Sequence, residues 1–563
     1  MKSATQKLTL AALAAAALMI GGTMPAHAAS RNYRDLLRLF DEWRAFEAPI
    51  VRDCVPDYTA AAMAAKAEGL ADFRKRLAAF DDSAWTPAQR TDLAYVEAEM
   101  NGLDFDLRVM RPWARDPSFY ALVFGEESDV PEHEGPNARP AIDLYKYRFP
   151  LSQADQKDLT CRLRAVPALL EQAKVNLKQG NARDLFAYGE RAFRWQIDAL
   201  KGVENGTSAM RTLEGPVRGS LEGASPALKD AFAAAREASE AFIQWIKAEA
   251  PSKTGPSGVG KDNYDWYMKH VRLTPYGWEE QVSYLRRELE RARASLALEE
   301  FRNRSSPSAP SFDDEAAYLE MARAKMAALT DFLIESGIVA DKPYYRDALR
   351  NQIGAFTPPG ERNFFSIGAA FDPTPLYSHF YHWIELAMRK HEAHKSFIRA
   401  AEPLYDLYDG RSEGMATAME EIVMHMGLYD DNPRSREIVW IMLANRAARG
   451  LASLYVAANE MSLDEAGEFH AKWTPRKWSD PTSDLVGFEQ LLYLRQPGYG
   501  ASYVTGKIEL DRLMSEYAFI QEQKGEAFNL AGFFKALNAS GIIPFALIQQ
   551  ELGADAIRAG GAR

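Results

Sequence analysis

The feature that most constrains the fold is a helical repeat of apolar residues, which recurs along almost the whole chain. Side chains three or four positions apart share one face of an α-helix. One such stripe consists of Val282, Leu285, Leu289, Ala292 and Leu296. Capping boxes, which mark helix starts, pair Thr86 with Gln89 and Ser462 with Glu465. Strand-like alternation of apolar and polar residues is scarce, so the sequence predicts an all-α protein with a large multi-helix body.

The N-terminus has the three parts of a secretory signal peptide. Lys2 and Lys7 are followed by an apolar run over residues 8–20 and by a small-x-small cleavage signal that ends at Ala28. We expect residues 1–28 to be removed. No cysteine follows the expected cleavage site immediately, so a lipid anchor is not expected, and no later apolar run is long enough to span a bilayer. These features predict a soluble exported protein, periplasmic or secreted, without membrane insertion.

The chain is acidic. Its formal net charge is −11, which becomes −13 when the two lysines of the signal peptide are removed. Nucleic acids and anionic membranes bind basic surfaces, so the charge argues against both as main partners.

Two cysteines, Cys54 and Cys161, are present. In an oxidising compartment they could form one disulfide, and two buried free thiols are the alternative. The sequence leaves both possibilities open.

A run rich in proline, glycine and serine at residues 251–260 gives the clearest boundary. It predicts two lobes, an N-terminal helical lobe over residues 29–250 and a C-terminal helical lobe over residues 261–563, with a central cleft within one continuous domain. Another loop, residues 125–143, carries prolines and glycines and is long enough for a lid or for a plain excursion.

Histidines gather in one short segment of the predicted C-terminal lobe. The nine histidines of the chain include four within sixteen residues, namely His379, His382, His391 and His394. The first two and the last two are each spaced i, i+3, so each pair shares a helix face. Glu413 opens the next predicted helix and could face them. Gluzincin peptidases hold zinc with His and Glu from two antiparallel helices, but their HExxH motif is absent here. A rearranged site could also use Glu385 or Glu392.

Segments along most of the mature chain, in the same order, resemble a large bacterial family of helical proteins of unknown function. They are DEWRAF, WTPAQRTDLAYVEAEM, RAVPALLEQAKVNLKQG, GKDNY followed by LTPYGWEE, SEGMATAMEE, MGLYDD, PGYGASYVTGK and GIIPFALIQQEL. Well-preserved members of this family look like zinc-dependent gluzincin peptidases. The resemblance implies a two-lobed, gluzincin-peptidase-like helical fold. It also implies that Glu413 matches a third metal ligand and that Tyr503 matches a tyrosine that polarises a substrate carbonyl.

The chain departs from the metal motif of this family, which reads His-Glu-x-x-Pro-Gly-His. If His382 is the first histidine, Trp383 replaces the glutamate and the second histidine is lost. If His391 is the first histidine, Glu392 is retained, but the Pro-Gly turn is missing and His394 comes too early. A zinc-hydroxide mechanism needs replacements for such losses.

Three functions remain open. One is an exported peptidase-like hydrolase with a rearranged active site, acting on a peptide or small amide-like substrate. Another is a metal-independent lyase or isomerase that acts on a small aromatic or apolar molecule, because a buried His-Glu pair can hold one group as a base near neutral pH. The third is a catalytically inactive binding protein.

The expected partner is a peptide or small-molecule substrate, and the oligomeric state stays open. The loop QPGYGASYVTGK, before a helix expected from about Lys507, brings two of the site tyrosines together. The predicted site residues are Glu413, Tyr503, Glu392 and His382 for catalysis, Tyr499, Arg446 and Tyr264 for substrate binding, and His382, His391, His394 and Glu413 for zinc if a metal is bound.

Overall fold

The computed structural model describes residues 32–307 and 310–560, with side chains described up to residue 553. The expected signal peptide and its cleavage site lie outside these residues. The α-helices are α1 (Tyr33–Glu47), α2 (Ala60–Leu77), α3 (Pro87–Phe105), α4 (Pro112–Arg115), α5 (Gln153–Leu177), α6 (Arg183–Tyr188), α7 (Glu190–Glu204), α8 (Pro226–Glu249), α9 (Lys261–Tyr267), α10 (Trp278–Arg302), α11 (Glu315–Glu335), α12 (Pro343–Arg350), α13 (Phe364–Phe371), α14 (Thr374–His379), α15 (Tyr381–His391), α16 (Phe397–Ala400), α17 (Asp409–His425), α18 (Arg434–Ala457), α19 (Leu463–Trp473), α20 (Asp484–Arg495), α21 (Tyr499–Gln523), α22 (Leu530–Ala539) and α23 (Phe545–Gly560).

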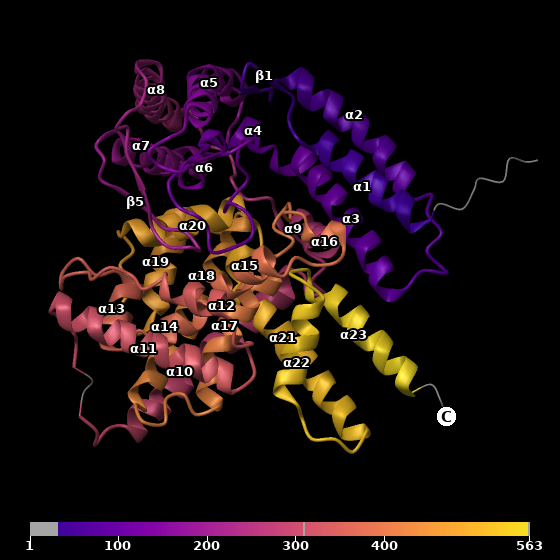
Figure 1. Ribbon diagram of the computed structural model, residues 1–563, viewed down its shortest axis with the longest axis vertical. Coiled ribbons are helices and arrows are strands. Elements are labelled where there is room, and N and C mark those ends of the chain that lie inside the picture. Colours follow the sequence, from indigo (N-terminus) through magenta and orange to yellow (C-terminus); the bar gives the residue numbers. More distant parts are fainter. Residues whose placement is uncertain (1–31, 308–309, 561–563) are drawn as a thin grey trace, which may run out of the picture.

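Strands are short and occur in pairs. They are β1 (Val51–Arg52) with β2 (Val55–Pro56), β3 (Val123–Phe124) with β4 (Ile142–Asp143), and β5 (Ser208–Met210) with β6 (Val217–Gly219). The β3–β4 pair is parallel and the other two are antiparallel. The predicted all-α fold is therefore confirmed (Figure 1).

Two expected helix starts are confirmed at the level of single hydrogen bonds. The Thr86 hydroxyl accepts from the Gln89 backbone, and the Gln89 side chain accepts from the Thr86 backbone. Ser462 and Glu465 make the same reciprocal pair at the start of α19. Each box supplies partners for backbone N–H groups that the first helical turn leaves free.

The described side chains form two large hydrophobic cores. One lies within residues 58–246 and joins α5, α7 and α8. The other joins α1, α2 and α3 with elements that follow residue 258. Figure 1 shows the same arrangement, because the indigo α1–α3 layer lies apart from the purple α5–α8 group and beside the later helices. The division into lobes 29–250 and 261–563 stays a prediction.

The cysteines form a disulfide, which settles the alternative left open by the sequence. Cys54, in the turn between β1 and β2, is bonded to Cys161 on α5. The bond links segments that are 107 residues apart in sequence.

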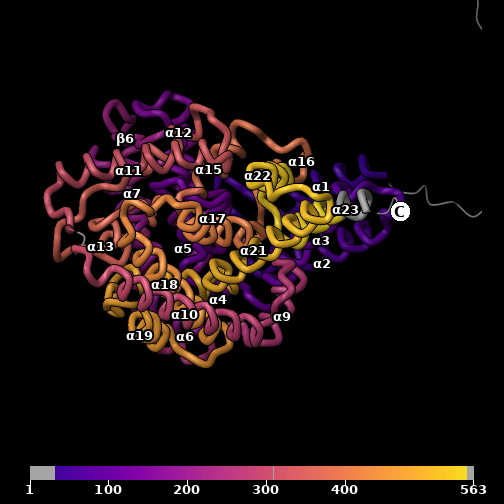
Figure 2. The backbone as a smooth tube through the Cα atoms, turned by 90° about the horizontal axis from the view of Figure 1, so that it is seen from below, coloured from indigo at the N-terminus to yellow at the C-terminus, as the bar shows by residue number. Residues whose placement is uncertain are grey.

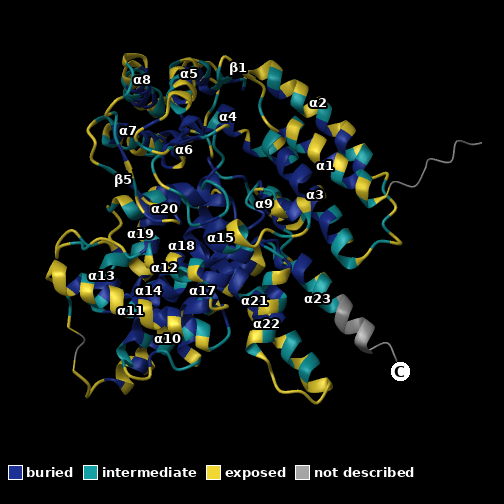
Figure 3. Cartoon of the chain, viewed as in Figure 1, coloured by how far each residue is buried: buried dark blue, intermediate teal, exposed yellow. Residues whose placement is uncertain are grey.

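Helices α17 and α18 lie in the interior, and most of their residues are buried (Figure 3). Helix α17 crosses α21 closely near the middle of the molecule (Figure 2). Glycines make this approach possible, because a Cβ on Gly414 would lie only 2.5 Å from the Gly506 Cα atom. The residue before Gly414 is Glu413, so this crossing brings the predicted ligand against the first turns of α21.

Helix α21 begins earlier than the sequence predicts. It starts at Tyr499 rather than at about Lys507. Gly498, with φ +89°, turns the chain immediately before it, and Gly500 and Gly506 lie at helix contacts rather than in a loop. The glycines of this segment predict a loop, but in the structure they allow close helix packing.

Candidate functional site

Three donor side chains meet where α14 and α15 face α17. His379 ends α14 and His382 lies in the first turn of α15, so the break at Phe380 separates them. The Nε2 atom of His382 lies 3.2 Å from Oε2 of Glu413, and Nε2 of His379 lies 3.7 Å from the same oxygen. One donor atom from each residue lies within 4.8 Å of the other two. The cluster is buried or nearly so.

The other nitrogen of His379 faces an ion pair. Its Nδ1 lies 3.0 Å from Oε1 of Glu420 and 3.2 Å from Nη2 of Arg446. Arg446, on α18, pairs with Glu420 at 2.6 Å. Because this pair fills the Nδ1 side of the ring, Nε2 is the nitrogen that faces Glu413.

Charge couples His382 and Glu413. Burial opposes protonation of His382, but the Glu413 carboxylate and the hydrogen bond to it outweigh burial and raise the His382 pKa to about 9. Burial disfavours the charged form of Glu413, yet the two imidazoles hold its pKa well below the ordinary value. At neutral pH the two residues therefore form an imidazolium–carboxylate pair.

Two tyrosines of α21 border this pair. The Tyr499 hydroxyl lies 2.5 Å from Oε1 of Glu413 and 3.0 Å from Oε1 of Glu134. The Tyr503 ring stacks on the His379 imidazole, with centroids 6.0 Å apart and planes 14° apart. The guanidinium of Arg449 lies 4.4 Å from the centroid of the Tyr503 ring.

The loop over residues 125–143 covers the cluster. Val130 packs into a small apolar cluster that contains both site tyrosines of α21. Glu134 reaches the Tyr499 hydroxyl, and the Arg495 Nη2 atom donates to the backbone carbonyl of Pro136. Of the two alternatives for this loop, the contacts favour a cover over the site.

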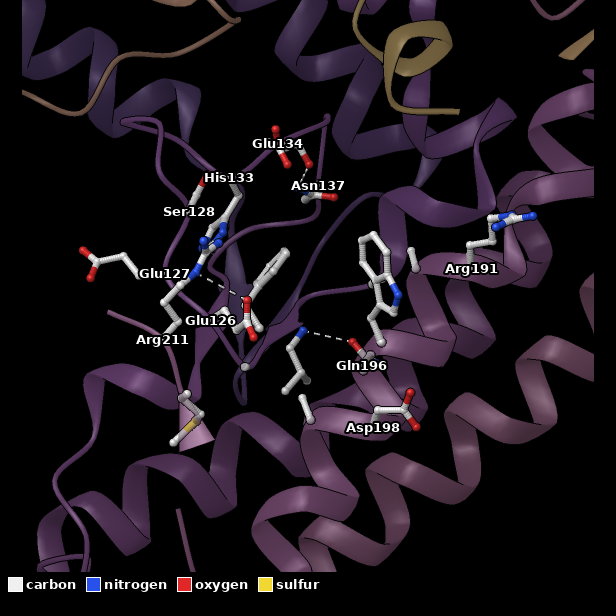
Figure 4. Close-up of a pocket in the computed structure, with 18 of the residues that line it drawn as sticks. Glu126, Glu127, Ser128, His133, Glu134, Asn137, Arg191, Gln196, Asp198 and Arg211 are labelled. Atoms are coloured by element: carbon white, nitrogen blue, oxygen red, sulfur yellow. Dashed lines mark hydrogen bonds and ion pairs between the residues drawn. The ribbon is translucent and has the colours of Figure 1, made fainter. Parts of the chain in front are cut away.

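A pocket of about 680 Å³ lies beside this cover. Its apolar wall includes Phe124, Trp195, Phe488 and Leu492, and Glu134 is part of its lining. Trp195 is 54% exposed and its ring lies 4.5 Å from that of Phe488. Figure 4 shows residues that line this pocket, with the charged side chains of the 126–134 segment on one side. The pocket can therefore hold an apolar or aromatic group next to a carboxyl.

Not all predicted site residues meet at this cluster. His382, Glu413, Tyr499, Tyr503 and Arg446 do, and they are joined by His379. The remaining four lie elsewhere, as follows: Glu392 accepts from Tyr344 and Tyr345, His391 stacks on Tyr344, His394 accepts from the Ser396 backbone, and Tyr264 donates to Gln281.

The length of α15 explains the separation of its histidines. Nine residues separate His391 from His382, which corresponds to about 13 Å along a helix. His379, by contrast, is three residues from His382 across the break at Phe380. The structure thus brings His379 to Glu413 instead of His391 or His394.

Sequence reasoning did not find Glu420 or Glu134. Glu420 follows Glu413 by seven positions, which is the spacing of one helix face, so a signal was present. Glu134 gave no such signal, because it lies on an irregular loop far in sequence from His379 and His382.

Among the described residues, no helix combines the length and apolarity needed to cross a bilayer. Fold and site together define an all-α protein with a buried His-Glu cluster beside an apolar pocket. The chain belongs to the bacterial family of proteins of unknown function DUF885, whose family model matches residues 45–552. No functionally curated protein matches the chain in sequence.

Two solved structures are similar over most of their length. One is a candidate lipoprotein of unknown function from Shewanella oneidensis, with a TM-score of 0.63 and 14% identity, covering 92% of this chain and 97% of that one. The other is a candidate lipoprotein from Colwellia psychrerythraea, with a TM-score of 0.63 and 13% identity, covering 93% and 98%. At these identities the likeness establishes the fold alone. The resemblance to gluzincin peptidases therefore remains an expectation.

Proposed function

We propose that the protein is a metal-dependent hydrolase that cleaves a peptide or small amide with an apolar or aromatic group. His379, His382 and Glu413 would hold the metal, and zinc is the ion that this donor set suits. The observation that carries the proposal is the convergence of two Nε2 atoms and one carboxylate oxygen in a buried space.

The donor spacing supports this assignment. Zinc bonds of about 2.0–2.1 Å place neighbouring donors of a tetrahedral site roughly 3.3 Å apart. The distances from Oε2 of Glu413 to the two imidazole nitrogens are 3.2 and 3.7 Å. Small side-chain movements would bring these atoms into range of one ion.

The groups behind the donors support it as well. Metal-binding histidines usually have a carboxylate or carbonyl on the second ring nitrogen, which fixes the ring. Glu420 takes this place for His379, and Arg446 holds Glu420. The Tyr499 hydroxyl donates to Oε1 of Glu413. The other carboxylate oxygen of Glu413, Oε2, is directed at the histidines.

When bound, such a metal supplies Lewis acidity toward a substrate carbonyl. The chain supplies the remaining functions. The apolar wall with Trp195 and Phe488 would bind the side group of the substrate and exclude water. The Tyr503 hydroxyl has no hydrogen-bond partner among the described side chains, so it is free to donate to a substrate oxygen.

A metal-independent lyase or isomerase is the second candidate. The His382–Glu413 pair, at 3.2 Å, favours it because an imidazolium and a carboxylate already form an acid-base couple. General acid-base groups contribute about 10² to 10⁴ in rate. This function therefore extends to activated C–H or C–C bonds and not to ordinary peptide bonds.

Metal content of the purified mature protein, measured by mass spectrometry without added metal, tests the proposal. We expect about one zinc per chain in the wild type and in His391→Ala, and none in His379→Ala or Glu413→Ala. Circular dichroism would verify that each variant is folded. A metal-free wild type would exclude the hydrolase and leave the acid-base enzyme or a binding protein.

We also propose that the protein is exported and cleaved after Ala28. The disulfide supports this, because such bonds persist in oxidising compartments. N-terminal sequencing of the protein from the periplasm or medium should begin at Ala29. A cytoplasmic protein that retains Met1 would contradict the proposal.

A further inference from the structure

The hydroxyl of Tyr499 lies between two carboxyl groups. Its oxygen is 2.5 Å from Oε1 of Glu413 and 3.0 Å from Oε1 of Glu134. A phenol has one proton and can donate one such hydrogen bond at a time. If both carboxyl groups were ionised, one of them would face the phenol oxygen without a proton between them. The arrangement therefore needs a second proton.

The environment indicates where that proton is. The Tyr499 hydroxyl donates to Oε1 of Glu413, at 2.5 Å. The other oxygen of Glu413 faces the two imidazole Nε2 atoms at 3.2 and 3.7 Å, so Glu413 accepts hydrogen bonds on both sides and is the anion of the set. Burial first, and then the charges of Asp129 and Glu413, raise the pKa of Glu134 to about 8. Glu134 is thus the group that can donate to the Tyr499 oxygen while Tyr499 donates to Glu413.

Charged and titratable groups surround Glu134 from several elements. Asp129 is on its own loop, Glu413 on α17 and Arg211 on the β5–β6 connection, and only the last of these favours ionisation of Glu134. The tyrosines that interact electrostatically with Glu134 are Tyr408, Tyr493, Tyr499 and Tyr503.

Glu134 is also placed to meet a substrate. It is part of the lining of the 680 Å³ pocket, and the neighbouring backbone is fixed. Asn137 donates to the carbonyls of Glu134 and Gly135, and Arg495 donates to the carbonyl of Pro136. A fixed carboxyl at the pocket wall satisfies the geometric requirement for a general acid. At position 383, where the family motif has glutamate, this chain has a buried tryptophan.

We propose that Glu134 is the catalytic acid-base residue of this site and that Tyr499 positions it. The proposal rests on the hydrolase function proposed above. Water adds through its oxygen to the amide carbonyl carbon. As the C–N bond breaks, its electron pair stays on nitrogen, which takes the proton of Glu134. The proton released from the added water returns to the Glu134 carboxylate, so the acid is regenerated.

Paired substrates test this role. The amine of a peptide amide is a poor leaving group and needs a proton, whereas p-nitrophenolate leaves from an ester of the same acyl group without one. Dipeptide amides and p-nitrophenyl esters with an aromatic acyl side chain are the probes. We expect Glu134→Gln to lower amide turnover by about 10² to 10⁴-fold and to change ester turnover less than about tenfold. The matched control is Glu126→Gln, which removes an exposed carboxylate from the same pocket and should leave both unchanged.

Two further measurements separate this proposal from the proposed function. Metal content should be equal in Glu134→Gln and wild type, so a metal-free wild type would overturn the hydrolase, not the assignment of the proton. Infrared spectroscopy at pH 7 should show a protonated carboxyl that is lost in Glu134→Gln and retained in Glu126→Gln. Equal losses of amide and ester turnover, no loss of either, or no difference in the protonated carboxyl would each overturn the role of Glu134.

Discussion

The two ends of α15 offer similar side chains but lie in different surroundings. At the first turn His382, with His379 just before the helix, faces Glu413 in the interior. At the last turn His391 is exposed, and Glu392 is held by two tyrosines of α12. Both histidine pairs of the segment have i, i+3 spacing. The expectation that each pair shares a helix face is wrong, because the chain breaks at Phe380 between the first two histidines and α15 ends at His391 before the last one. The difference between the two ends is that a second element, α17, supplies a buried carboxylate only at the first.

The largest expected effect distinguishes the two ends directly. His382→Ala should lower amide turnover by at least about 10³-fold, because it removes a metal donor and the partner of Glu413. His394→Ala should change turnover less than about threefold, because its ring is hydrogen-bonded to the Ala539 carbonyl and the Ser396 backbone and not to Glu413. Steady-state kinetics on the same amide measures both. Equal losses in the two variants would show that the two ends of α15 do not differ in their contribution to turnover.

A smaller effect should come from the group behind His379. Glu420→Gln removes the charge that faces Nδ1 while keeping the side-chain shape. Loss of such a partner typically costs 10 to 100-fold in metal affinity or activity. Competition with a chelator, followed by metal analysis, measures the affinity. Glu421→Gln is the control, because Glu421 pairs with Arg291 of α10 and not with His379, and it should leave metal affinity unchanged.

His470 is a third buried histidine, and it serves as a comparison for the effect of Glu413 on His382. Burial and then the charge of Arg449 lower the His470 pKa to about 3, and Nε2 of His470 lies 2.8 Å from the Asn445 amide nitrogen. Because the unfolded chain binds this proton below about pH 6.5, stability falls as pH drops from there toward 3. Between pH 7 and pH 5 the contribution is about 2 kcal/mol.

Urea unfolding of wild type and His470→Gln at pH 7 and pH 5 measures this difference. The variant should lose about 2 kcal/mol less than wild type on acidification. An identical drop in both proteins would show that His470 is not held neutral by its surroundings. His470 would then not differ from His382 in its charge at neutral pH through its surroundings.

The smallest effect is expected at the outer end of α15. Glu392→Gln weakens hydrogen bonds from Tyr344 and Tyr345 and an ion pair with Lys342. The free energy of unfolding should fall by about 1 kcal/mol. Metal content and amide turnover should stay at wild-type values. A loss of metal in this variant would show that Glu392 does belong to the metal site, as the sequence predicts.

Local signals predicted much of the fold. The capping boxes at Thr86 and Ser462 form as expected, and Glu413 lies in the first two turns of a helix next to the histidine segment. Such features depend on residues within a few positions of each other, so they can be recognised in the sequence.

Long-range packing decided the membership of the site. Glu134 precedes Glu413 by more than 270 positions in the printed sequence, and only the folded loop brings it to Tyr499. Gly500 and Gly506 looked like loop residues, yet they lie in α21 where it contacts α18 and α17. No local pattern distinguishes a glycine that bends the chain from one that lets two helices approach.

The sequence by itself determined that the chain is helical, that it is acidic, and that a histidine-rich helical segment precedes the helix of Glu413. Tertiary structure decided which histidines meet Glu413, that Cys54 and Cys161 are joined, and that Glu134 covers the cluster. The physical reason is that helix formation follows from side chains a few residues apart. A site requires atoms from distant segments within about 3–4 Å, and packing of the whole interior sets those distances.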